Sequence, residues 1–293
     1  MILREKPGIV ALLFAVRGSV LPRILPRILA VSALAAVVVW LDGNILPLPH
    51  TNAAPFAVFG VALSLFLGFR NNAAYERWWE GRCLWGQLLA DLRALGRDAE
   101  LFLPQREDRQ QLLRLALGFI HLHRINLRKS SDFTQANAWA GEDFSQAPHP
   151  PCAVMNRMTT LAATSAPDGF ARKALSERLS SITLAQAGCE RIAATPLPYV
   201  YSLLVFRTTY LYCLLIPFAL LESTGWMTPV FVAIVAYVFF GLAEVTEELS
   251  HPFGETVNGL PLDAVCRTAE ISLCDHLEQT PPAPMTPQNY ILT

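Results

Sequence analysis

The chain has 293 residues, of which 53% are hydrophobic and 16% are charged, and its formal net charge is -1. With a mean hydropathy of +0.34, it is too apolar for an ordinary soluble domain and too charged to lie entirely within a bilayer. The near-zero net charge and the lack of a Lys/Arg-rich run argue against a nucleic-acid partner. We therefore expect a membrane protein with a substantial part in water.

Four segments approach the length needed to cross the roughly 30 Å hydrocarbon core of a bilayer. They are residues 28–41, 53–69, 196–221 and 223–243. The last of these is uncharged throughout and, with 21 residues, long enough to span the core alone, which makes it the clearest prediction of the four. The sequence therefore predicts an all-α membrane protein with four transmembrane helices.

The basic residues predict the orientation of these helices. Residues 42–52, between the first two spans, contain no Lys or Arg. The N-terminal segment and the stretch after the second span are basic, with Arg4, Lys6, Arg17 and Arg23 in the first and Arg70, Arg77, Arg82, Arg93 and Arg97 in the second. Because positive residues stay on the cytoplasmic side, we expect both termini and the long middle region to be cytoplasmic.

The remaining sequence divides into helical and irregular parts. Apolar residues recur every three or four positions from Glu76 to Arg128 and again over 170–194, which predicts helices. Residues 129–169 are rich in Ser, Thr, Ala, Asn and Pro and predict a loop-rich excursion with short helices at most. A break after His251 should precede a new helix at Leu262. The expected domains are 1–75 with the first two spans, a cytosolic helical region 76–195, spans three and four in 196–243, C-terminal helices in 244–280, and a disordered or extended tail, 281–293.

Residues 60–69, GVALSLFLGF, hold two stripes that each repeat every four residues. Val61, Leu65 and Phe69 make a bulky stripe, which on a helix would present apolar groups about 6 Å apart. The small stripe beside the bulky one consists of Gly60, Ser64 and Gly68. Small residues at this spacing let neighbouring helices approach closely. In a ring of identical subunits the bulky stripe would then face the symmetry axis. A packing ridge in a monomeric bundle would give the same pattern.

Candidate chemical sites are few. No nucleophile elbow, phosphate-binding glycine loop or triad pattern occurs, so we do not expect an enzyme. His121 and His123 are two residues apart and would point to different helix faces, which favours a structural role over metal binding. Glu247 and His251 share a helix face near Glu255 and are weak candidates for a metal, and a polar helix end is the simpler interpretation. We expect no cofactor.

Four blocks of sequence resemble the bestrophins, a family of pentameric ion channels, in its bacterial branch. They are FLGFRNNAAYERWWEGRCLWG, CERIAATPLP, FRTTYLYCLLIPFAL and EELSHPFGETVNGLPLDAVCRTAE. The resemblance extends from about Arg17 to Glu278 and implies a funnel-shaped homopentamer around one central pore, in the bacterial inner membrane. Each subunit would contribute four transmembrane helices and a large helical cytosolic region.

The resemblance also implies roles for particular residues. The hydrophobic neck of the family falls on Val61, Leu65 and Phe69, the stripe that the register singles out. The inner mouth of the neck would be formed by Arg70, Asn71 and Asn72. Family members narrow again near the start of the third span, where the candidates are Leu197, Val205 and Ile192.

The resemblance leaves the permeant ion open. Eukaryotic bestrophins conduct chloride, and Arg70 near the neck also favours small anions, whereas some prokaryotic relatives conduct monovalent cations. A third hypothesis is a membrane scaffold whose cytosolic helices bind a partner protein. Eukaryotic members bind calcium through an acidic run after the PFG turn, but here Glu255 is followed by no further carboxylate until Asp263. Calcium needs six to eight oxygen ligands, so we do not expect calcium activation.

Overall fold

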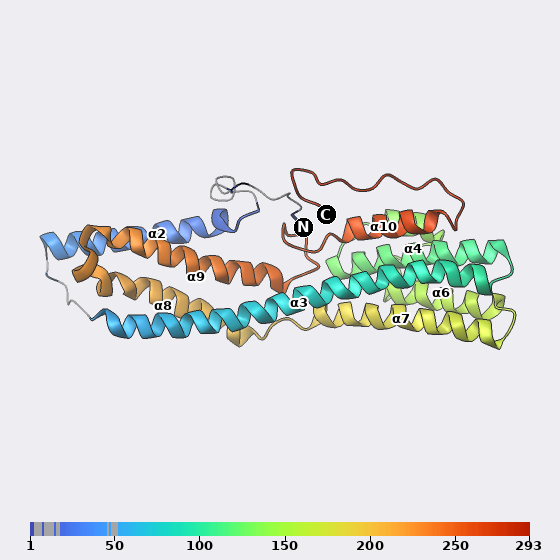
Figure 1. Ribbon diagram of the computed structural model, residues 1–293, viewed down its shortest axis with the longest axis horizontal. Helices are drawn as coiled ribbons and strands as arrows, with labels where there is room; N and C mark the ends of the chain where they lie inside the picture. The colour runs from blue at the N-terminus through green and yellow to red at the C-terminus, as the bar shows by residue number, and fades with distance from the viewer. Residues whose placement is uncertain (3–7, 9–14, 16–17, 46, 48–51) are drawn as a thin grey trace. The chain divides into compact units, whose positions relative to one another are not determined.

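The computed structural model describes residues 1–2, 8, 15, 18–45, 47 and 52–293 (Figure 1). Within these residues the chain is helical, and its β-type pairing is limited to isolated bridges of Ile291 with Ile2 and Gln288. The helices are α2 (Leu21–Asn44), α3 (Ala53–Phe102), α4 (Arg106–Arg128), α5 (Thr134–Ala140), α6 (Pro150–Ser165), α7 (Gly169–Ala194), α8 (Tyr199–Thr224), the 3-10 turn η1 (Gly225–Met227), α9 (Thr228–Ser250) and α10 (Leu262–Cys274). This confirms the all-α prediction for the described part of the chain.

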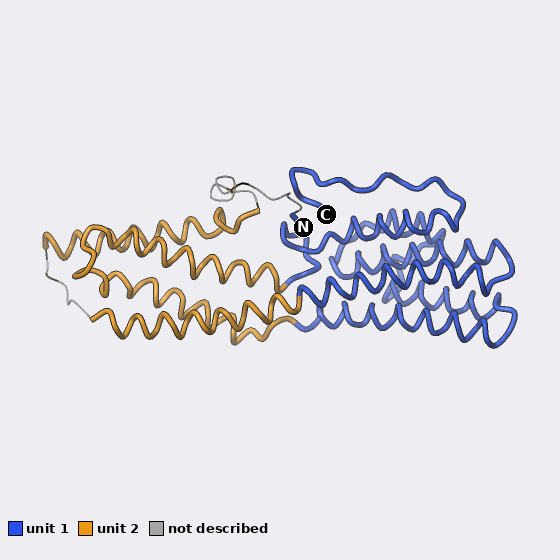
Figure 2. Tube along the Cα trace, in the orientation of Figure 1, with its two compact units in different colours: residues 1–4, 78–195, 251–293 blue, residues 5–77, 196–250 orange. Residues whose placement is uncertain are grey.

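The chain divides into two compact units (Figure 2). Unit 1 contains residues 1–4, 78–195 and 251–293, and unit 2 contains residues 5–77 and 196–250. Helix α3 runs for 50 residues and contributes its first half to unit 2 and its second half to unit 1. Unit 2 reaches Ser250, beyond the expected boundary at Ala243, because the last turns of α9 pair with arginines of α2.

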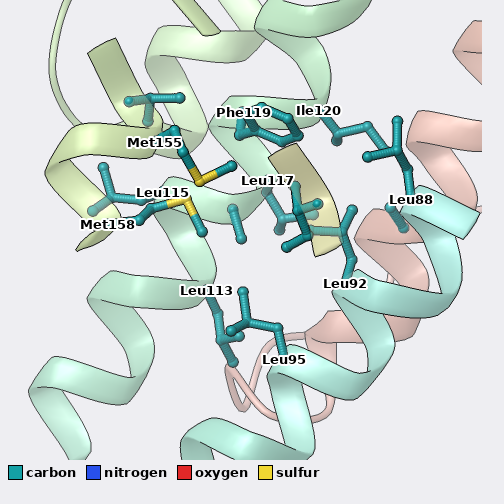
Figure 3. Packing of buried hydrophobic residues seen from close by; sticks show 14 of the residues in the cluster. Leu88, Leu92, Leu95, Leu113, Leu115, Leu117, Phe119, Ile120, Met155 and Met158 are labelled. Carbon is teal, nitrogen blue, oxygen red and sulfur yellow. The ribbon is translucent and has the colours of Figure 1, made fainter. Parts of the chain in front are cut away.

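The core of unit 1 is built around α4. Every residue of this helix from Leu112 to His123 is buried except Arg114, so far more than a single apolar stripe is covered. Leu88, Leu92 and Leu95 of α3 are buried in the same cluster, together with Met155 and Met158 of α6 (Figure 3). Gly118 lets α5 come close, since a Cβ at this position would lie 2.7 Å from the Cβ of Ala140.

The prediction of a loop-rich excursion over 129–169 is wrong for its second half. Residues 150–165 form α6, and its first turn contains Pro150 and Pro151. Proline at the start of a helix is favourable because the first N–H groups have no intrahelical partner, and the ring Nδ1 of His149 accepts from the Cys152 N–H at 3.3 Å. The prolines that suggested a loop therefore mark a helix start, and Met155 and Met158 bury the apolar face of this helix.

Unit 2 contains the apolar helices. Among the residues that the structure describes, three stretches are long and apolar enough to cross a membrane: 21–44, the apolar part of 53–102, and 199–250, which comprises α8, η1 and α9. Helix α2 packs on α9 and α8, and α8 packs on α9. Ile24 of α2, Leu63 and Leu67 of α3, and Val232 and Phe240 of α9 lie in one buried cluster.

Several boundaries follow the sequence prediction. Pro104 lies between the end of α3 and the start of α4, α7 matches the predicted 170–194 within one residue, and α10 begins at Leu262 as expected. Residues 275–278 after α10 form turns, residues 279–287 form neither helix nor strand, and the Leu292 N–H donates to the Met1 carbonyl at 2.8 Å. The final segment is therefore held against unit 1.

Candidate permeation site on helix α3

The bulky stripe of α3 is uncovered within the subunit. The side chains of Val61, Leu65 and Phe69 are 62%, 58% and 70% exposed, although they belong to a helix long and apolar enough to cross a membrane. Leu63 and Leu67, each two residues from Leu65 and so about 160° around the helix, are 2% and 0% exposed. The subunit therefore packs one face of α3 and leaves the opposite, apolar face free.

The three residues of the small stripe differ in what they contact. A Cβ at Gly60 would lie 2.6 Å from the hydroxyl oxygen of Tyr212, and the rings of Phe59 and Tyr212 meet edge to face at 5.5 Å, so Gly60 allows α3 and α8 to approach closely. Ser64 is exposed, with its hydroxyl donating to the Val61 carbonyl at 2.8 Å. A Cβ at Gly68 would meet no described atom within 4 Å. The subunit therefore uses Gly60 for internal packing and leaves Ser64 and Gly68 available to another molecule.

Arg70, which is expected at the inner mouth of the neck, lies on a different face of α3 from the bulky stripe. Arg70 follows Leu65 by five residues, about 140° around the helix, and it is 9% exposed. Its Nη2 donates to Glu247 Oε2 at 2.8 Å and to Ser202 Oγ at 3.0 Å. Arg70 is therefore held inside the chain, where the Glu247 carboxylate offsets its charge; its place at the mouth of a neck stays a prediction.

The two asparagines after Arg70 differ from each other. Asn71 is half-buried, and its Oδ1 accepts from Thr246 Oγ1 at a long 3.4 Å. Asn72 is exposed and follows Leu65 by seven residues, which places it on the same face two turns along. Of the three polar residues expected at the mouth, Asn72 therefore continues the line of the bulky stripe.

The three residues considered for a second constriction differ in their exposure. Val205 is 3% exposed in the core of unit 2, and Ile192 is 3% exposed in the core of unit 1. Both side chains are enclosed by their own chain, which favours Leu197 among the three candidates; the position of a second constriction stays a prediction. Leu197 lines a cavity of about 460 Å³ in unit 2, next to Phe69.

A set of ion pairs joins the last turns of α9 to α2. Arg23 pairs with Glu248, which is 8% exposed, and its Nη1 lies 3.7 Å from Glu244 Oε1. Arg27 Nη1 lies 3.5 Å from Glu244 Oε2. The positive-inside rule uses Arg23 only as a positive charge, so it does not reveal these partners. The four-residue spacing of Arg23 with Arg27, and of Glu244 with Glu248, was the available signal, because such residues share a helix face.

The three weak candidates for a metal site lie in three different environments. Glu247 pairs with Arg70, His251 is exposed just beyond α9, and Glu255 borders a pocket of unit 1. Among the described residues no group of three His, Cys, Asp or Glu side chains is close enough to hold a metal ion.

The two histidines of α4 are buried in the core of unit 1. His121 Nε2 donates to Glu270 Oε1 at 2.8 Å. The ring of His123 stacks against Trp85 and Phe119 at centroid distances of 5.5 and 5.9 Å. Burial lowers the pKa of His123 to about 3, so its ring is neutral at physiological pH. Both residues therefore serve packing and hydrogen bonding, as their spacing indicated.

Comparison with known proteins gives consistent relatives over nearly the whole chain. Residues 1–275 match the family model described as bacterial/fungal bestrophin protein. A protein of Mesorhizobium japonicum, named as a voltage-dependent anion channel-forming protein, is 43% identical over 99% of this chain and 96% of its own length. A protein of Escherichia coli K12 with the same type of name is 36% identical over the full length of both chains.

Solved structures agree with the sequence comparison. The crystal structure of a bacterial bestrophin homologue from Klebsiella pneumoniae is 30% identical and superposes with a TM-score of 0.81, covering 90% of this chain and 100% of the other. A variant of that homologue superposes with a TM-score of 0.80 and covers 88% of this chain. The sequence blocks, the helical fold and these matches together show that the chain belongs to the bacterial/fungal bestrophin family.

Proposed function

We propose that this chain forms a homopentameric channel that passes small anions such as chloride through a hydrophobic neck of Val61, Leu65 and Phe69. The observation that supports this best is the free apolar stripe on α3, opposite the face that the subunit buries. In a closed ring, one such stripe from each subunit would meet at the axis.

The small residues beside the bulky stripe favour an arrangement in which the bulky side chains face the ring axis and not the lipid. Ser64 and Gly68 lie beside it without a packed helix within the described part of the subunit. Uncovered small residues on a membrane helix suit close approach by a second helix. With a neighbouring subunit on that side, the bulky stripe is turned away from lipid, and apolar rings of this kind gate by wetting and dewetting.

In this proposal each subunit crosses the membrane four times, with α2, the first part of α3, α8 and α9. The turn η1 divides the apolar stretch 199–250 into two helices, and α8 with 26 residues is about 39 Å long, enough to span the bilayer. The membrane part comprises 1–75 and 196–243, and 76–195 and 244–280 are cytosolic with the tail 281–293. The distribution of basic residues supports a location in the bacterial inner membrane with both termini on the cytoplasmic side.

The names of the relatives support anions as the permeant species. The neck itself carries no charge, and the pairing of Arg70 with Glu247 removes the local argument for anions. Sodium or potassium therefore remains the alternative. Reversal potentials of the purified protein in planar bilayers, measured in a potassium chloride gradient, decide between them: a shift toward the chloride equilibrium potential supports the proposal, and a shift toward that of potassium overturns it.

A scaffold that binds a partner protein through unit 1 is the second alternative. The scaffold hypothesis predicts that liposomes with the purified protein release no chloride. The channel proposal predicts that they release chloride and that liposomes without the protein do not. Absence of flux from correctly assembled protein would favour the scaffold.

The assembly state is a direct test of the ring. Because Ser64 and Gly68 are uncovered on an apolar helix, we expect a stable pentamer in mild detergent. Native mass spectrometry should give five chains of 32.4 kDa as the main species. A monomer or dimer under the same conditions would rule out a pore on the ring axis.

We also expect the channel to be indifferent to calcium. Glu255 is exposed and no cluster of three candidate ligands occurs among the described residues, so a hard cation would lack charged oxygens. Open probability in planar bilayers should be equal in chelator and in micromolar calcium, for the wild type and for Glu255→Gln alike. Steep activation that Glu255→Gln abolishes would show that this loop binds calcium.

A further inference from the structure

A cavity of about 460 Å³ lies in unit 2 between α3 and the start of α8. Its walls include Phe66, Phe69, Arg70 and Ala73 of α3, and Leu197 and Tyr201 from the α8 side. The volume falls in the range of small-molecule sites, and the walls combine apolar surface with one charged group, as such sites commonly do. We call it the Arg70 cavity.

Arg70 is the charged residue among those that line this cavity. Its Nη2 donates to Glu247 and Ser202, and its Nε is buried without a hydrogen-bond partner among the described residues. A guanidinium presents five N–H donors as a planar fork, so part of it can bind an acceptor in the cavity while Nη2 stays paired.

The start of α8 adds a second positive group. The helix begins at Tyr199 after Pro198, without a side-chain cap from the described residues and without an acidic residue in its first turn. The amino end of a helix carries a partial positive charge and free N–H groups. Ser202, in the first turn, ties Arg70 to this end. A buried guanidinium thus lies beside the positive end of a helix, and the carboxylate that offsets it, that of Glu247, is 55% exposed.

We infer that the Arg70 cavity binds a monocarboxylate with an apolar body. The carboxylate would accept hydrogen bonds from the Arg70 guanidinium and from the N–H groups at the start of α8, other than that of Tyr201, which donates to the Pro198 carbonyl. The apolar body would pack on Phe66, Phe69 and Ala73. Inorganic anions fit poorly, because most of the wall offers no partner for their remaining oxygens. A ligand against Phe69 would also affect the neck; that consequence rests on the proposed function, whereas binding itself does not.

The test uses the full chain in phosphatidylcholine nanodiscs, with octanoate as the probe and isothermal titration calorimetry as the measurement. Octanamide keeps the apolar body without the charge, and acetate keeps the charge without the body. We expect octanoate to bind at least tenfold more tightly than octanamide, and acetate to show no binding. Equal affinity for octanoate and octanamide would indicate partition into lipid and would overturn the inference.

Two variants locate the site without disturbing the Arg70–Glu247 pair. Ala73→Leu fills the cavity and should weaken octanoate binding at least tenfold. Ala57→Leu makes the same change at an exposed position of α3 outside the cavity, and it should bind like the wild type. Wild-type affinity in Ala73→Leu would overturn the inference. Palmitate added to the nanodisc identifies the source: competition with octanoate indicates a membrane fatty acid, and no competition indicates a soluble acid.

Discussion

Replacing Leu65 with Ala should raise ion flux through the pentamer roughly tenfold, the change produced by lowering a barrier by about 1.4 kcal/mol. The middle ring of the proposed neck would lose three carbon atoms from each subunit. Passage through an uncharged constriction is limited by removing water from the ion, so a wider and wetter ring lowers that barrier. Single-channel conductance and open probability in planar bilayers measure the effect.

The matched control is Leu211→Ala on α8. Leu211 is 49% exposed in the subunit, close to the value for Leu65, but it lies on a different helix. The same truncation there should leave conductance unchanged. Ser64→Leu should instead weaken assembly, because a large side chain replaces a small one where a neighbouring helix would approach. If Leu65→Ala has no effect in an intact pentamer while Ser64→Ala alters permeation, the register of the neck is wrong.

Removing the Glu270 carboxylate should destabilise unit 1 by about 3–5 kcal/mol, the usual cost of leaving buried charged and polar partners unpaired. Glu270 is 3% exposed. Its Oε1 accepts from His121 Nε2 at 2.8 Å and from Trp139 Nε1 at 2.9 Å, and its Oε2 lies 3.1 Å from Arg267 Nε. These partners come from α4, α5 and α10, so Glu270→Ala loosens three helices at once. Urea unfolding followed by circular dichroism measures the loss.

The contribution of Glu270 depends on pH with a defined sign. Burial by itself raises the pKa of this carboxyl, but the hydrogen bonds from His121 and Trp139 and the charge of Arg267 together hold the pKa below its usual value. The stabilisation is therefore complete above the unfolded-state pKa, about 4.3, and is lost as the pH falls through the lower native pKa. The stability difference between wild type and Glu270→Gln should accordingly be constant near neutral pH and shrink in acid.

Glu177→Gln provides the control for both Glu270 experiments. Glu177 is exposed on α7, where it pairs with Lys173 one turn away, and exposed pairs of this kind contribute little. Its removal should leave the unfolding curve unchanged at every pH. A Glu270→Ala protein as stable as Glu177→Gln would show that the buried network does not hold the helices together.

Much of the candidate site follows from local sequence. The four-residue repeat of Val61, Leu65 and Phe69 places them on one helix face whatever surrounds the helix, because the α-helical period alone decides it. The structure adds that this face is the free one. Arg70 shows the limit of such reasoning: it is one residue from Phe69, yet its partner Glu247 is 177 residues away, and no local pattern specifies that pair.

Composition and periodicity within single segments are enough to predict the apolar helices, the α-helical class, the start of α10 at Leu262 and the register of the α3 stripe. Tertiary packing decided which faces are covered. It enclosed Val205 and Ile192 in the cores of the two units, turned Arg70 toward α8 and α9, and brought His121 to Glu270 across 149 positions. Burial and charge pairing depend on side chains from distant segments meeting, and neither can be obtained from one stretch of sequence.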